Sequence, residues 1–313
     1  MRSAIAFLVL TPILAAAEPK TRTFRFTYEA TVTGLAPGQE ARIWLPVPST
    51  TDDQEILAID KHFPTEPALN TETGLGNRMF YLSAKADADG TIPLEAVYTV
   101  KRKEVKGETD KTLHDMLDQY LKFDPLSKPD GKQMRLLEGK KLPDDSMAKA
   151  KELYEIVNGM LHYSKDGTEW GRGDVDWVCD SKYGNCTDFH SLFIALARSE
   201  KIPARFEIGF GLPAKRGVGD IAGYHCWAKF KPEGKGWVPV DISEANKNPK
   251  MKDYYFGNLT EDRVTFSNGR NITLAPKQDG PPLNFFVYPY VEVGGKPYAT
   301  DKVKRKFGFE DVK

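Results

Sequence analysis

Cys186 lies where a cysteine could act as a nucleophile. It follows the turn residues Gly184-Asn185 and begins a predicted helix over 186–200. Backbone N–H groups and the positive end of the helix dipole point at such a position, and both stabilise a thiolate. The thiolate is the nucleophilic form of cysteine. A free cysteine is commonly a small core residue, so this position alone does not assign catalysis.

His225 and Asp241 could complete a catalytic arrangement with this cysteine. They lie in two predicted strands joined by a short turn, and pairing Phe230 with Gly236 places His225 opposite Asp241. Opposed residues of an antiparallel pair share a face, with Cβ atoms about 4.5–5.5 Å apart. The carboxylate could then hold one imidazole nitrogen and leave the other for the thiol. A structural His–Asp contact is the alternative, and the three residue types together favour a Cys186–His225–Asp241 triad.

The other cysteines, Cys179 and Cys226, leave two alternatives open. Strand alternation turns Cys226 away from His225, and a Cys179–Cys226 disulfide is permitted outside the cytoplasm. A zinc site built from the three cysteines and His225 is disfavoured, because alternation separates His225 from Cys226 and no C-x-x-C spacing exists. We therefore expect no metal and no other cofactor.

The side-chain donor of an oxyanion hole is not identified by these patterns. Trp170 and Trp177 precede the nucleophile, and each could either donate an indole N–H or wall a groove. Asp188 and His190 lie on the nucleophile helix and could touch the site, but a helix-end charge effect and a helix-surface contact explain them adequately.

Two kinds of periodicity predict an α+β fold that positions these residues. Short alternating runs with Gly, Pro and Asp turns predict an antiparallel β-sandwich over 18–105, followed by a linker with short helices over 106–144. A 3.6-residue period then begins, and the helices and strands that carry the triad fall within 145–250. Strand-like runs over 251–313 predict a C-terminal β-rich extension packed on this core.

The stretches around the triad resemble the core of the transglutaminase-like superfamily. They read GNCTDFHSLFIALARSEKIPARFEIGF, GYHCWAKF and GWVPVDISEANK. The resemblance implies a papain-like core, in which the helix that carries the nucleophile packs on an antiparallel sheet, and a Cys186–His225–Asp241 triad. An N-terminal sandwich fits the one that often precedes this core in secreted bacterial members.

The resemblance also limits the reactions that we expect. Members include protein cross-linkers, peptidases, amide hydrolases and inactive scaffolds, and the active forms share acyl transfer through a thioester. The expected function is thiol-dependent acyl transfer on amide bonds of proteins or peptides, by cross-linking, deamidation or peptide hydrolysis. The alternative is a catalytically inactive extracellular scaffold.

Composition limits the kinds of partner that the protein can have, and the N-terminus predicts its compartment. The chain has 313 residues, with 44 Lys and Arg against 44 Asp and Glu. This neutral balance argues against a nucleic-acid partner, since phosphate binding requires a surplus of basic residues. Residues 1–17 combine Arg2, an apolar run and Ala15-x-Ala17, which predicts a secretory signal cleaved after Ala17. We expect a periplasmic or secreted protein without a membrane anchor, and the sequence does not indicate its oligomeric state.

Overall fold

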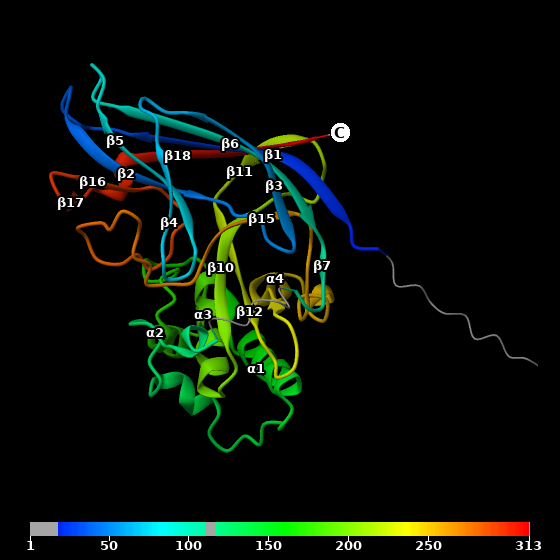
Figure 1. Cartoon of the computed structure of the whole chain (residues 1–313). Helices are drawn as coiled ribbons and strands as arrows, with labels where there is room; N and C mark the ends of the chain where they lie inside the picture. The colour runs from blue at the N-terminus through cyan, green and yellow to red at the C-terminus, as the bar shows by residue number, and fades with distance from the viewer. Residues whose placement is uncertain (1–17, 110–116, 313) are drawn as a thin grey trace, which may run out of the picture.

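The computed structural model describes residues 18–109 and 117–312, so the predicted signal at 1–17 lies outside the described residues. Two five-stranded sheets occupy one end of the molecule, and helices packed on a four-stranded sheet occupy the other (Figure 1). All the strand pairs in these three sheets are antiparallel. The predicted α+β class is confirmed.

The two larger sheets form the sandwich. The first has the strand order β11-β18-β1-β6-β3 and the second the order β17-β16-β2-β5-β4. The first contains β1 (Thr21–Val32), β3 (Gln54–His62), β6 (Ile92–Lys103), β11 (Val218–Ile221) and β18 (Val303–Asp311). The second contains β2 (Glu40–Val47), β4 (Ala68–Thr71), β5 (Arg78–Lys85), β16 (Tyr290–Val293) and β17 (Lys296–Pro297).

Alternation along β1 buries one face of the strand between the sheets. Phe24, Phe26 and Tyr28 are fully buried, whereas the residues between them are partly or fully exposed. Successive strand side chains point to opposite faces, so this pattern assigns the apolar face to the core.

The prediction that 251–313 packs on the catalytic core is wrong for the last strands of the chain. Strand β18 pairs with β1, and β16 pairs with β2, so the C-terminus completes both sheets of the sandwich. The physical reason is that β1 and β2 would otherwise present unpaired backbone N–H and C=O groups at sheet edges. Phe307 and Phe309 of β18 are buried accordingly.

The third sheet, in the order β13-β12-β10-β15, carries the helices. Its strands are β10 (Ala204–Gly211), β12 (Tyr224–Phe230), β13 (Val238–Val240) and β15 (Arg263–Asn268). The helices are α1 (Ser146–Met160), α2 (Val175–Ser181), α3 (Cys186–Ser199) and α4 (Ile242–Lys247). Short pairs join β7 (Val105–Lys106) to β14 (Asn258–Leu259) and β8 (His162–Tyr163) to β9 (Tyr183–Gly184). Single 3-10 turns are η1 (Gln119–Leu121), η2 (Lys132–Leu136), η3 (Pro249–Met251) and η4 (Thr300–Lys302).

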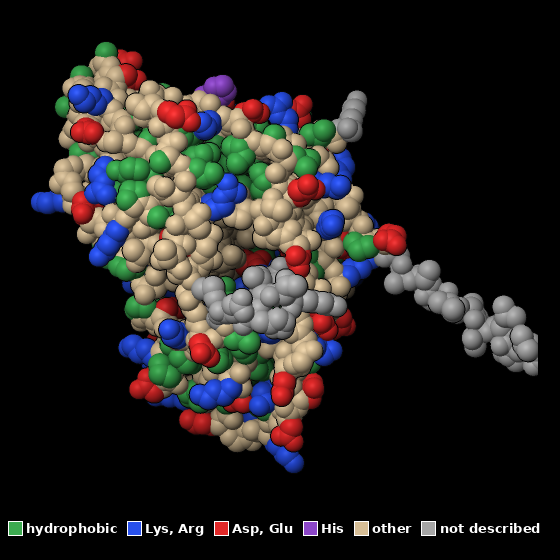
Figure 2. All heavy atoms as spheres, in the orientation of Figure 1, with side chains coloured by type: hydrophobic (Ala, Val, Ile, Leu, Met, Phe, Trp, Pro, Cys, Tyr) green, Lys and Arg blue, Asp and Glu red, His purple; other side chains and the backbone are tan. Residues whose placement is uncertain are grey.

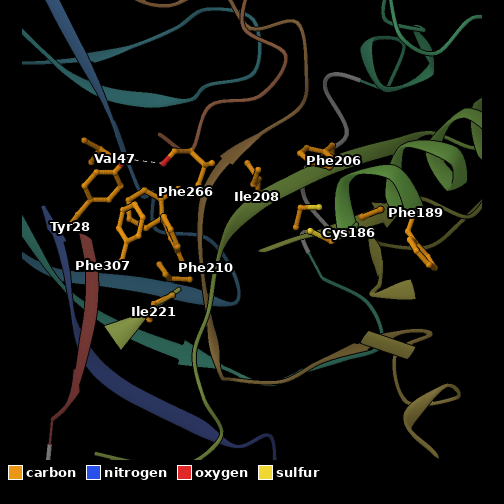
Figure 3. Packing of buried hydrophobic residues seen from close by; sticks show 14 of the residues in the cluster. Tyr28, Val47, Cys186, Phe189, Phe206, Ile208, Phe210, Ile221, Phe266 and Phe307 are labelled. Atoms are coloured by element: carbon orange, nitrogen blue, oxygen red, sulfur yellow. Dashed lines mark hydrogen bonds between the residues drawn. The ribbon is translucent and has the colours of Figure 1, made fainter. Parts of the chain in front are cut away.

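Strand β10 joins the sandwich to the helical layer. Phe210 at its end packs on Phe26 and Phe307, with ring centroids 4.8 and 4.5 Å apart. Phe206 and Ile208 continue the same apolar face toward the start of α3, as Figure 3 shows. One hydrophobic cluster therefore runs from between the sandwich sheets to the helix that begins with Cys186.

A buried ion cluster also ties the sandwich to the third sheet. Asp53 of the sandwich accepts from Arg102 at 3.0 Å and from Lys229 of β12 at 3.1 Å. The two cations lower the pKa of Asp53 despite its burial. This ion cluster thus fixes β12, the strand that carries His225, to the sandwich.

The charged side chains of both signs are interspersed over the face drawn in Figure 2. Within the described ranges, no helix combines the length and the apolar character required to cross a membrane.

Candidate active site

Cys186 occupies the first position of α3, as the sequence predicts. The Asn185 side chain caps the helix by accepting from the Thr187 N–H at 2.8 Å. The Asp188 carboxylate accepts a hydrogen bond from the Asn185 N–H at 2.9 Å, which completes a capping box. Cys186 is 3 % exposed. Within 18–109 and 117–312, its own N–H donates to no acceptor, which leaves it free to bind a ligand at the helix start.

Asp188 also fixes the loop that approaches the nucleophile. Its carboxylate accepts from the N–H groups of Gly171 at 2.7 Å and Gly173 at 2.9 Å. Gly184 permits this arrangement, because a Cβ at that position would collide with the Asp188 carboxylate. A helix-end role explained Asp188 adequately from the sequence, and the structure shows that it also holds the loop of Gly171 and Gly173.

The three predicted site residues come together. His225 Nε2 lies 2.8 Å from Asp241 Oδ2, and His225 and Cys186 interact closely enough for each to shift the pKa of the other. Because Asp241 occupies Nε2, Nδ1 is the ring nitrogen that remains for the thiol. The order nucleophile, base and orienting carboxylate is that of a catalytic triad.

The strand register behind this contact differs from the predicted one. Phe230 pairs with Val238, two residues further along than the predicted Gly236. A shift of two residues keeps every side chain on its original face, so Asp241 still points toward His225. Strand β13 ends before Asp241, whose side chain instead caps α4 by accepting from the Glu244 N–H at 3.1 Å.

Electrostatics favour a charged pair. Burial alone would lower the pKa of His225, but Asp241 and Cys186 outweigh it and raise that pKa to about 9. Burial alone would raise the pKa of the Cys186 thiol, but hydrogen bonds from Cys226 and His225 and the imidazolium charge lower it well below its usual range. Both shifts favour a thiolate beside an imidazolium.

Asp241 has a second cationic partner that the sequence did not reveal. Arg263 of β15 donates to Asp241 Oδ2 at 3.1 Å, and its guanidinium lies 4.7 Å from the centroid of the Trp227 ring. Although burial opposes ionisation of Asp241, His225 and Arg263 lower its pKa. An arginine 22 residues further along the chain gave no local signal, since β15 reaches the site only through sheet pairing.

Cys226 lies closer to the nucleophile than strand alternation suggested. It does leave the face of His225, but its sulfur packs on the first turn of α3, 3.8 Å from Thr187 Oγ1, and it shifts the pKa of Cys186. All three cysteines are free, and Cys179 is half-buried on α2. In the part of the chain that the structure describes, no three His, Cys, Asp or Glu side chains form a group suited to a metal ion.

The triad opens into a groove of about 790 Å³. Cys186 and His225 line it together with aromatic rings and with charged groups of both signs: Tyr163, Lys165, Trp170, Asp220, Glu244, Lys247 and Tyr288. The sandwich contributes one wall through β11, whose Ile221 lines the groove and pairs with β18.

Neither tryptophan considered as an oxyanion donor is placed for that role. Trp170 lines the groove, but its indole N–H donates to the Gly167 carbonyl at 3.0 Å. Trp177 lies on α2 and lines a different cavity, together with Asp174 and Asp180.

Comparison with known proteins agrees with this geometry. Residues 135–242 match the family model of the transglutaminase-like superfamily. The chain carries a transglutaminase-like core. The predicted superfamily is thus confirmed, and the match begins within the segment that the sequence assigned to a linker over 106–144.

Two known proteins are similar to this chain over nearly its whole length. An uncharacterized protein of Haemophilus influenzae is 29% identical over 324 residues, which cover 88% of this chain and 86% of the relative. The solved structure of a proposed cysteine protease from Cytophaga hutchinsonii superimposes with a TM-score of 0.59 at 18% identity, over 94% of this chain and 98% of the other. The fold, sandwich included, is therefore shared with that structure.

Proposed function

We propose that the protein is a thiol-dependent acyl-transfer enzyme that acts on amide bonds of proteins or peptides. The arrangement of Cys186, His225 and Asp241 carries this proposal, and the 2.8 Å contact between His225 Nε2 and Asp241 Oδ2 is the observation on which it rests most directly. The Cys186 thiolate attacks the amide carbonyl, and the C–N bond then breaks. His225 gives its proton to the departing amine, while Asp241 holds the ring in place.

The resulting thioester is resolved by water or by an amine. His225, now neutral, takes a proton from that acceptor as the acceptor attacks, and the Cys186 sulfur leaves. The Cys186 N–H, which has no acceptor within the described residues, donates to the oxyanion of both tetrahedral intermediates. Water as the acceptor gives hydrolysis or deamidation, and an amine gives cross-linking.

The groove supports a protein or peptide substrate. It is long enough to be lined by α3, by the segment before β12 and by the sandwich-paired strand β11. Its aromatic rings and mixed charges suit a polypeptide segment that offers polar side chains and amide groups.

One experiment tests the reaction and identifies the acceptor. The mature protein is incubated with a peptide library and a labelled primary amine, and the products are analysed by mass spectrometry. Amine incorporation identifies a transferase, cleaved peptides a protease, and released ammonia without incorporation a deamidase.

Variants make this experiment specific to the proposed nucleophile. Cys186→Ala should abolish every product while the fold persists, because a small residue is tolerated at a helix start. Cys179→Ala, on α2 and away from the groove, should leave product formation unchanged. If the wild type modifies no substrate and an electrophile does not label Cys186, the protein is a scaffold and the proposal fails.

Export is part of the proposal. The predicted cleavage after Ala17 leaves a mature chain that begins at Glu18, at the edge of the described residues. N-terminal sequencing of the protein recovered from outside the cytoplasm should give Glu18 as the first residue.

A further inference from the structure

We propose that Cys226 is a resolving cysteine: when an oxidant attacks Cys186, the two sulfurs form a reversible disulfide that switches the enzyme off. The proposal rests on the nucleophilic Cys186 of the proposed function, but not on which amide the enzyme uses. It assigns an oxidative modification site to a residue that the triad chemistry leaves without a role.

The position of Cys226 is fixed at the first turn of α3. Its sulfur lies 3.8 Å from Thr187 Oγ1 and 3.7 Å from His190 Nδ1. His190 Nδ1 is in turn 2.7 Å from the Cys186 carbonyl oxygen. Cys186 and Cys226 also shift each other's pKa, which agrees with this placement. The Cys226 sulfur therefore faces the first turn of the helix that begins with Cys186, and a disulfide requires the two sulfurs to approach to about 2 Å.

The two cysteines differ in access, and this difference gives each a separate part in the reaction. Cys186 lines the groove, whereas Cys226 is 0% exposed and does not line it. A small hydroperoxide can therefore reach the Cys186 sulfur but not the Cys226 sulfur. Susceptibility to oxidation follows thiolate character and access. Burial raises the pKa of the Cys226 thiol, whereas the pKa of Cys186 is lowered, so Cys186 has the greater thiolate character.

The chemistry balances with a hydroperoxide as the oxidant. The Cys186 thiolate attacks the terminal peroxide oxygen, the O–O bond breaks, and Cys186 becomes a sulfenic acid while an alcohol or water leaves. The Cys226 sulfur then attacks the Cys186 sulfur, the S–O bond breaks, and hydroxide leaves with the Cys226 proton as water. Two thiols lose two electrons, and the peroxide gains them.

The disulfide would both silence and protect the nucleophile. A sulfenic acid without a neighbouring thiol proceeds to the sulfinic acid, which ordinary thiols do not reverse. A disulfide stops at the first two-electron step and returns to two thiols when a dithiol reductant arrives. An enzyme outside the cytoplasm, as export would place it, meets oxidants without the thiol buffer of the cell.

The test compares three proteins treated with hydrogen peroxide in increasing amounts. These are the wild type, Cys226→Ser and the matched control Cys179→Ser. Samples are digested without reductant and analysed by mass spectrometry, and a second portion is reduced and labelled at Cys186 with an electrophile. For the wild type and Cys179→Ser, we expect a peptide that joins Cys186 to Cys226 and full recovery of labelling after reduction.

Cys226→Ser should behave differently. Its Cys186 should accumulate as sulfinic acid, and labelling recovered after reduction should fall roughly tenfold below the wild type. Should this variant not fold, the joined peptide in the wild type alone still decides the matter. The absence of that peptide, with equal recovery in all folded proteins, overturns the proposal.

The readouts separate this proposal from the proposed function. If an electrophile labels Cys186 but peroxide gives no disulfide, the switch is wrong and the nucleophile stands. If an electrophile fails to label Cys186 in the untreated protein, the nucleophile is wrong, and both proposals fail together.

Discussion

His190 accepts the backbone N–H of Ile242 at its Nε2 atom, over 3.0 Å. That nitrogen therefore carries no proton, and Nδ1–H donates to the Cys186 carbonyl at 2.7 Å. Burial lowers the pKa of His190 to about 4, so the ring is neutral. The neutral His190 ring therefore links Cys186 to Ile242, the residue that follows Asp241.

We expect His190→Ala to lower both stability and turnover. It removes a fully buried ring and leaves a buried N–H and a buried carbonyl without their partner, which costs about 2–4 kcal/mol of unfolding free energy. The distance between Cys186 and Asp241 would also relax, and a misplacement of about 1 Å can cost about 10²-fold in rate. Urea unfolding and turnover per folded molecule measure the two effects.

His62→Ala provides the control. The His62 side chain is 75% exposed on the sandwich, so its removal should change the unfolding free energy by less than about 0.5 kcal/mol. If His190→Ala were as mild as His62→Ala, the bridge between Cys186 and Ile242 would not position the site.

The buried His190 predicts a loss of stability at acid pH. Its pKa is lowered to about 4, so the unfolded chain binds a proton that the folded chain does not, and stability is lost as the pH falls from about 6.5 toward 4. The pKa of His225 is raised to about 9, so its stabilisation is lost as the pH rises from about 6.5 through about 9. The lowered pKa of Cys186 contributes in the opposite sense over the same range, so the two contributions offset each other.

The contribution of His190 should be on the order of 3 kcal/mol. Urea unfolding at a series of pH values between about 4.5 and 8.5 measures it. The decline at acid pH should be smaller in His190→Ala than in the wild type. An acid decline of equal size in His190→Ala and the wild type would assign that titration to another group.

The nucleophile helix was predictable because its signals are local. The Gly-Asn turn, the capping residues and the apolar repeat all lie within one segment, and the predicted range 186–200 differs from α3 by one residue at its end. The predicted contact of His225 with Asp241 is present although the predicted strand register was wrong. The register differs by two residues, and an even shift keeps each side chain on its face of the sheet.

Other features could not be predicted because they depend on distant pairing. Strand β18 joins β1 across almost the whole chain, and no local pattern says which sheet edge a strand will fill. Arg263 reaches Asp241 through β15, and Cys226 reaches Cys186 because α3 packs on the face opposite His225. Alternation gives the face of a side chain but not the element that covers it.

Asp188 and Gly184 should behave as a coupled pair. Asp188→Asn replaces one acceptor oxygen with an NH₂ group that faces backbone donors, which should cost about 2–4 kcal/mol of unfolding free energy. Gly184→Ala forces a Cβ against the same carboxylate and should be similarly costly. Because both changes displace one contact, the double variant should lose less than the sum of the two single losses.

A double-mutant cycle by urea unfolding measures this coupling, with the exposed Asp166→Asn as the control for the loss of a carboxylate. Strict additivity, within about 0.5 kcal/mol, would show that Gly184 is not required for the approach of Asp188.

Asp241→Asn should affect both turnover and stability, since the Asp241 carboxylate accepts from His225 and Arg263 and also caps α4. Asparagine still caps a helix, but it leaves the buried Arg263 without its carboxylate partner, at a cost of about 3–5 kcal/mol. The substitution also permits the wrong His225 tautomer and weakens the stabilisation of the charged His225 ring. We expect turnover per folded molecule to fall about 10- to 10³-fold, less than the roughly 10⁴-fold loss in serine enzymes, because the helix start helps to preform the thiolate.

Arg263→Gln separates the catalytic effect of Asp241 from the structural one. It breaks the same ion pair but leaves the Asp241 carboxylate on His225, so it should lower the melting temperature while turnover per folded molecule stays within about threefold of the wild type. The alkaline limit of the pH–rate profile should move upward in Arg263→Gln, since His225 then has the full charge of Asp241 to itself, and downward in Asp241→Asn. Melting and turnover are measured on the same preparations. Unchanged turnover in folded Asp241→Asn would exclude Asp241 from the triad, and the orienting group for His225 would have to be sought elsewhere.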